Sequence, residues 1–175
     1  MNVLTAERID AILNYADKLR IAADIHDRPM DVEKFIQKLS GSIEKAKMDD
    51  NGVIPNSRII PGDGDKFIIK YHPNKDDKSD RFQLAHIVGH LLLHTNYIRD
   101  GSIKEEYVDK YFNDNDANLF ASAILMPREQ FLYVSSKNMI KSRYNVKEIA
   151  DCFGVPERRV RDYGRMISSY RWSDI

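Results

Sequence analysis

The stretch Arg81–Thr95, RFQLAHIVGHLLLHT, carries three of the chain's five histidines, His86, His90 and His94, each four residues from the next. Residues four apart lie on one face of an α-helix, so the imidazoles of His86 and His90 can point at one metal ion. The residues around them are apolar, which predicts a buried helix. Buried imidazoles need polar partners. The stretch therefore indicates either a metal site or core histidines that bond to nearby backbone.

A zinc site needs a third protein ligand, and residues 114–127, DNDANLFASAILMP, offer Asp114. Asp114 begins a helical stripe that includes Ala121, with Ala117 beside it, so this helix can pack closely with the carboxylate at the seam. Gly89 costs the histidine helix about 1 kcal/mol, which close approach of another backbone or of a ligand would explain. Asp114 could instead be a helix N-cap. We expect zinc at His86, His90 and Asp114.

The remaining sequence predicts short elements of both kinds. Residues 42–48, 52–60 and 65–73 are strand-like segments separated by turn residues, which favours a small antiparallel sheet of three strands. The segments on either side have helical periodicity. We expect an α+β fold in which a mainly helical domain with this sheet spans residues 1–127. A helical, helix-turn-helix-like subdomain would follow at 128–175.

Residues 146–163, VKEIADCFGVPERRVRDY, have the spacing of a helix-turn-helix. The small side chain of Ala150 lets two helices cross, Gly154 supplies the turn, and Val160 packs beneath the second helix.

This C-terminal part is basic although the whole chain is neutral: residues 137–171 hold nine Lys/Arg and four Asp/Glu. The basic residues that crowd the second helix, and that we expect to bind a partner, are Arg158, Arg159, Arg161 and Arg165. Such a cluster fits phosphate contacts to DNA. It equally fits a solvated face or a surface for an acidic protein, and we favour a protein partner over DNA.

Composition indicates an ordinary globular protein, with 42% hydrophobic and 31% charged residues. The single cysteine, Cys152, excludes an intrachain disulfide and fits a reducing compartment. The N-terminal stretch is charged and lacks an apolar signal core, and the run HLLLH is too short to span a bilayer. We expect a cytoplasmic protein with no membrane segment.

Two of these stretches resemble motifs of the ImmA/IrrE zinc metallopeptidases, a gluzincin-like family of bacteria and phages. RFQLAHIVGHLLLH is similar to R-F-x-x-A-H-E-x-G-H-x-x-x-H, and DNDANLFASAILMP is similar to E-x-x-A-N-x-F-A-x-x-L-L-M-P. The resemblance implies that His86 and His90 bind zinc, that Asp114 takes the place of the family's usual glutamate ligand, and that His94 is an accessory group. It also implies that the domain at 1–127 is metallopeptidase-like and that the protein acts on a partner transcriptional repressor, in phage, mobile-element or stress regulation.

The chain departs from the motif at Ile87, where the family has the glutamate that acts as general base. Isoleucine cannot move a proton, and loss of a positioned base costs roughly 10²–10⁴-fold in rate. Another carboxylate, Glu105, Glu106 or Asp116, could reach in. We therefore expect impaired peptidase activity and assign no catalytic residue. The alternative is a pseudo-peptidase, a non-catalytic regulator that binds a repressor or DNA through its C-terminal helices.

Overall fold

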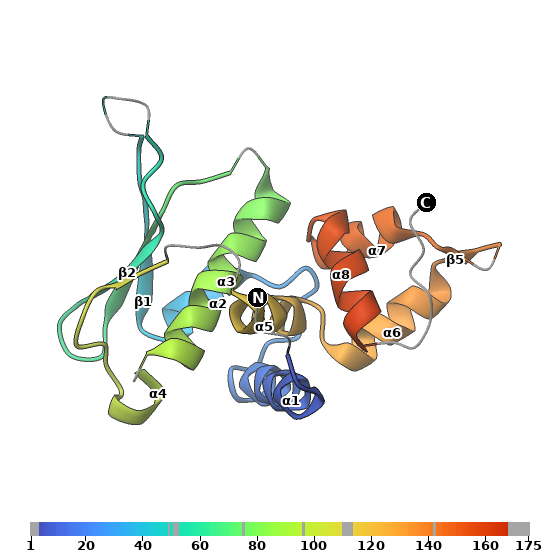
Figure 1. Cartoon of the computed structure of the whole chain (residues 1–175), viewed down its shortest axis with the longest axis horizontal. Helices are drawn as coiled ribbons and strands as arrows, with labels where there is room; N and C mark the ends of the chain where they lie inside the picture. Colours follow the sequence, from blue (N-terminus) through green and yellow to red (C-terminus); the bar gives the residue numbers. More distant parts are fainter. Residues whose placement is uncertain are drawn as a thin grey trace.

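The computed structural model describes residues 4–48, 50, 53–74, 76–95, 97–109, 114–141 and 143–167, and not the side chain of Ile98. In chain order the described helices are α1 (Ala6–Ala22), α2 (Val32–Lys38), α3 (Asp77–His94), α4 (Tyr97–Asp100), α5 (Asn115–Leu125), α6 (Arg128–Lys137), α7 (Val146–Phe153) and α8 (Glu157–Ile167). The strands are β1 (Gly41–Lys45), β2 (Arg58–Pro61), β3 (Phe67–Tyr71), β4 (Tyr107–Val108), β5 (Met139–Ile140) and β6 (Arg143–Tyr144). The predicted α+β class is confirmed. Figure 1 shows the main sheet on one side, α3 in the middle and helices α6–α8 on the other side.

The main sheet differs from the predicted three-stranded antiparallel sheet, because it has four described strands in the order β1-β3-β2-β4. β1 runs parallel to β3, whereas β2 is antiparallel to both β3 and β4. The segment between α3 and α5 contributes β4, which pairs with Arg58 and Ile59 of β2. Two residues are too few to show strand periodicity. Residue 52, in the second predicted strand, lies outside the described residues.

Helix α3 is buried along its second half and packs against α5, which in turn lies against α1 (Figure 1). The crossing of α3 and α5 is close at Gly89. A Cβ atom built there would lie 3.1 Å from the Ala117 Cα atom and 3.2 Å from the Phe120 ring. Gly89 is thus explained by the approach of another backbone, as the sequence indicated.

Helices α7 and α8 pack on each other and on the first half of α3. Gly154 has a left-handed backbone with φ +62°, and Ala150 and Val160 are fully buried. The Arg81 Nη1 atom donates a hydrogen bond of 2.7 Å to the Gly154 carbonyl oxygen. A second link is the ion pair between Lys78 and Asp151. These contacts attach the C-terminal helices to the histidine helix; the division at 127/128 remains a sequence prediction.

No helix in the described part of the chain is both long and apolar enough to cross a bilayer. The longest, α3, is apolar in its second half but carries charged residues in its first.

Candidate metal centre

Three buried polar side chains converge between α3 and the end of β4. The Nε2 atoms of His86 and His90 lie 3.0 Å apart. One Asp109 oxygen lies 3.5 Å from His86 Nε2, and the other lies 3.5 Å from His90 Nε2. The exposed fractions of His86, His90 and Asp109 are 0%, 2% and 8%. These atoms form a compact donor set in the apolar interior.

The donor set has the chemistry and spacing of a zinc site. Two imidazoles and one carboxylate are the protein ligands of many catalytic zinc centres. Tetrahedral bonds of about 2.0–2.1 Å place neighbouring ligand atoms roughly 3.3 Å apart, and the observed separations of 3.0–3.5 Å bracket this value. His86, His90 and Asp109 therefore form a group that could hold a metal ion.

The local electrostatics keep this donor set ready for a cation. Burial lowers the pKa of His86, and the opposing hydrogen bond with Asp109 does not restore it, so the imidazole is neutral at ordinary pH. Burial alone would raise the pKa of Asp109, but hydrogen bonds with His86 and His90 outweigh it and hold the pKa well below its usual range. A neutral imidazole and an ionised carboxylate are the forms that bind a metal.

Strand β4 supplies both Asp109 and a partner for the second imidazole. Tyr107 Oη lies 2.8 Å from His90 Nδ1. If Nε2 of His90 held a metal ion, the protonated Nδ1 atom would donate a hydrogen bond to the tyrosine oxygen. This hydrogen bond would fix the orientation of the ring. The backbone N–H of Asp109 donates to the Ser57 carbonyl oxygen at 2.8 Å, extending the pairing between β2 and β4. The pleat thus turns Tyr107 and Asp109 toward the same face.

Asp114 is the N-cap of α5 in the structure. Its Oδ1 atom accepts a hydrogen bond of 2.8 Å from the Ala117 N–H, and the same oxygen lies 3.6 Å from His94 Nε2. Asp114, His94 and His90 form a second, more exposed group that could hold a metal. The structure therefore brings His86 together with Asp109 rather than with Asp114, because the capping position holds Asp114 at the start of the helix.

Ile87 lies in the apolar core with an exposed fraction of 1%. The carboxylates considered as substitutes for a base are engaged or exposed: Glu106 pairs with Arg58 at 3.1 Å, and Asp116 accepts from Arg8 Nε at 2.9 Å. Glu105 is exposed. None of the three belongs to either histidine–aspartate group.

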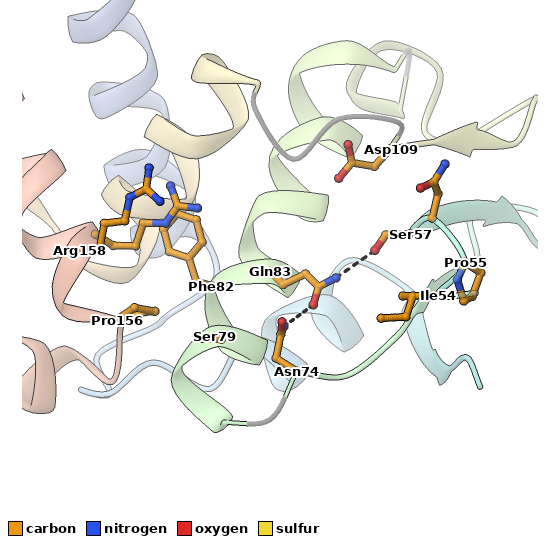
Figure 2. Close-up of a pocket in the computed structure, with 12 residues that line it drawn as sticks. Ile54, Pro55, Ser57, Asn74, Ser79, Phe82, Gln83, Asp109, Pro156 and Arg158 are labelled. Carbon is orange, nitrogen blue, oxygen red and sulfur yellow. Dashed lines mark hydrogen bonds between the residues drawn. The ribbon is translucent and has the colours of Figure 1, made fainter. Parts of the chain in front are cut away.

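The four predicted partner-binding arginines lie in different surroundings. Arg158 and Arg159 line a groove that reaches Asp109 (Figure 2). Arg161 pairs with Glu157 at 3.1 Å beside a separate cavity, and Arg165 pairs with Asp162 at 3.7 Å. Arg161 thus lies beside a different cavity from Arg158 and Arg159, whereas Arg165 shares Asp162 with Arg158.

Sequence reasoning missed Tyr107 and Asp109. Their only signal was alternation in the segment EEYVD, which puts positions 107 and 109 on one face of a strand. This segment is mostly charged and has only two apolar residues in a row, Tyr107 and Val108. Its sequence therefore does not indicate which face of the strand is turned toward the protein interior. The structure supplies the reason, since β2 pairs with this segment and turns it toward α3.

One comparison with known proteins found a match. The family model of the IrrE N-terminal-like domain, peptidase family M78, matches residues 53–161, which include α3, β4 and α5. No curated protein and no solved structure matches the chain significantly. The match covers more than half of the chain and includes both the paired histidines and the predicted third-ligand segment. The chain therefore belongs to the IrrE N-terminal-like family, which is a family of zinc metallopeptidases.

Proposed function

We propose that this protein is a zinc-binding regulator that acts on a partner protein, a transcriptional repressor of the helix-turn-helix type, and that its own peptide hydrolysis is strongly impaired. The observation that carries the proposal is the convergence of His86, His90 and Asp109 at ligand distances, beside a helix position where Ile87 replaces the general base. Family membership supports the metallopeptidase fold and the choice of zinc.

Each residue of the site has a distinct role in this proposal. His86, His90 and Asp109 hold the ion, and Tyr107 orients His90 through its Nδ1 atom. The chemistry that zinc supplies when bound is Lewis-acid polarisation of a carbonyl group and activation of water near neutral pH. Asp109 also lines the adjoining groove, so a partner segment in that groove would lie beside the metal ligands.

The impairment follows from the lack of a proton acceptor at position 87. A positioned base contributes roughly 10²–10⁴-fold to the rate, and the isoleucine side chain is packed in the core. Asp109 cannot take over as base while both of its oxygens face the imidazoles. The chain therefore keeps the means to bind a metal and a partner without the means to transfer the proton.

The repressor as partner rests on the family resemblance and suits phage, mobile-element or stress regulation. Such a repressor acts inside the cell, so the proposal places the protein in the cytoplasm. Within the described residues, a groove of about 510 Å³ would hold a partner segment beside Asp109.

A second candidate, DNA binding by the C-terminal helices, is favoured by the charge around another cavity of about 690 Å³. Its lining includes Lys141, Arg143, Lys147 and Arg161. Against it, the start of α8 faces α3, because the Arg159 guanidinium stacks over the Phe82 ring at 4.0 Å. A gel-shift assay over a range of salt concentrations tests this candidate: DNA binding through phosphates weakens steeply with salt, and no salt-sensitive shift removes it.

The test of the main proposal is incubation of the zinc-loaded protein with a candidate repressor, compared with its Ile87→Glu and Ile87→Gln variants. All three should bind the repressor, and only Ile87→Glu should cleave it. The glutamine variant is the matched control, since it has the same shape and polarity without a base. Thermal unfolding of each variant controls for the cost of a polar group at a buried position. Cleavage by the wild-type protein at the rate of Ile87→Glu would overturn the proposed impairment.

A further inference from the structure

A groove runs from the metal centre to the start of α8. Its floor is the first half of α3, one wall is the extended segment 54–57, and the other wall is α8 (Figure 2). Asp109 lies where the groove meets the metal centre. A chain of another protein in this groove would thus lie beside Asp109, one of the three candidate metal ligands.

The α8 side of the groove is positively charged. Arg158 has a side chain that is 85% exposed and shares the carboxylate of Asp162 with Arg165, at 3.6 Å and 3.7 Å. The neighbouring Arg159 is half-buried and stacked over Phe82, so its planar group is held in one orientation. Two adjacent guanidinium groups, one exposed and one held in place, suit bidentate recognition of a carboxylate.

The floor between the two sides is neutral and polar. The side-chain amide of Asn74 donates to the Gln83 oxygen at 2.5 Å, and the Gln83 amide donates to Ser57 Oγ at 3.1 Å (Figure 2). Amide and hydroxyl groups of this kind hydrogen-bond to a peptide backbone. The positively charged lining residues, Arg158 and Arg159, lie only at the α8 wall, whereas a nucleic-acid backbone would carry negative charge along the whole groove. The charge pattern therefore favours a peptide over a nucleic acid.

We propose that this groove binds an extended segment of the partner protein, and that Arg158 and Arg159 select an acidic side chain within that segment. The inference rests on the proposed function for its partner, and it adds the chemistry by which that partner is recognised. It divides the four arginines by role: Arg158 and Arg159 contact the partner segment, whereas Arg161 and Arg165 do not.

The test uses labelled nine-residue peptides of serine and alanine that carry two central residues of glutamate, glutamine or lysine. Fluorescence anisotropy with the zinc-loaded full chain should give about tenfold tighter binding of the glutamate peptide than of the glutamine peptide, and the preference should weaken with salt. Arg158→Glu should abolish or reverse the preference. Arg165→Ala is the matched control, since it also removes a partner of Asp162 but lies outside the groove lining, and it should bind as the wild type does.

A second variant tests Arg159. Complete removal of this side chain would also remove a contact between α8 and α3, so a conservative substitution is used. Arg159→Lys keeps the charge but loses the stacked planar group, so the glutamate preference should fall by less than in Arg158→Glu, with unchanged thermal unfolding. Equal affinity of the wild-type protein for glutamate and glutamine peptides overturns the inference. Arg158-dependent binding of a DNA duplex in place of any peptide also overturns it. Zinc content and repressor binding are measured on the same samples, so loss of the proposed function is distinguished from loss of acidic selectivity.

Discussion

The two histidine–aspartate groups differ in what else their aspartates do. Asp109 is buried, and its carboxylate oxygens face His86 and His90. Asp114 is about one-third exposed, and it caps α5 while it faces His94. Both groups share His90. The difference teaches that motif spacing can place a carboxylate near the paired histidines, whereas burial and competing hydrogen bonds distinguish the two candidate ligands.

The largest effect should come from removing the buried acid. Asp109→Asn leaves a neutral amide in place of the anionic ligand, and we expect zinc affinity to fall by more than the roughly 10–100-fold typical of a change in a supporting residue. Competition titration against a chromophoric chelator measures the affinity. Asp114→Asn is the paired variant and should keep zinc. If Asp114→Asn loses zinc and Asp109→Asn does not, the assignment of the two acids is reversed.

Tyr107→Phe should have the next largest effect on zinc. The variant removes the oxygen that accepts from His90 Nδ1 and leaves the ring packing in place, so we expect affinity to fall roughly 10–100-fold. The same chelator titration gives the value, and thermal unfolding of the metal-free protein should be little changed. An unaltered zinc affinity would show that the orientation of His90 does not depend on this tyrosine.

Gly89→Ala tests the close crossing that holds α5 beside the metal helix. The added methyl group would lie 3.1 Å from the Ala117 Cα atom, and such overpacking costs about 1–3 kcal/mol. The better helix propensity of alanine offsets up to about 1 kcal/mol of this. With this full offset, urea unfolding should show a net loss of up to about 2 kcal/mol. A variant more stable than the wild type would contradict the observed packing.

The smallest effect should come from the capping acid. Asp114→Ala should lower the free energy of unfolding by about 1 kcal/mol, since the Ala117 N–H loses its acceptor. Asp114→Ser should restore most of this stability, because serine also caps, and it should bind zinc as the wild type does. Loss of zinc from a fully stable Asp114→Ser variant would identify Asp114 as a ligand.

Features that depend on residues close in sequence were predicted well. The spacing of His86 and His90 placed both side chains on one helix face. Gly89 indicated close approach of another backbone or of a ligand, and the structure shows that α5 makes this approach. Ala150, Gly154 and Val160 likewise lie in α7, the turn and α8 as expected. These features follow from helix periodicity and glycine geometry, which are local properties.

Features that depend on pairing between distant segments could not be predicted. The parallel pairing of β1 with β3, and the addition of β4 to the sheet, depend on strand order. Asp109 reaches the metal centre only because β4 pairs with β2. The stacking of Arg159 on Phe82 depends on how α8 packs against α3. Within the basic segment 137–171, residues 142 and 168–171 lie outside the described residues.

The most direct test of the central claim is X-ray diffraction at the zinc absorption edge from crystals of the zinc-loaded protein. We expect one anomalous peak at about 2.0–2.2 Å from His86 Nε2, His90 Nε2 and an Asp109 oxygen. A peak bound by His94 and Asp114 without Asp109, or no peak in protein shown to be folded, would contradict the account.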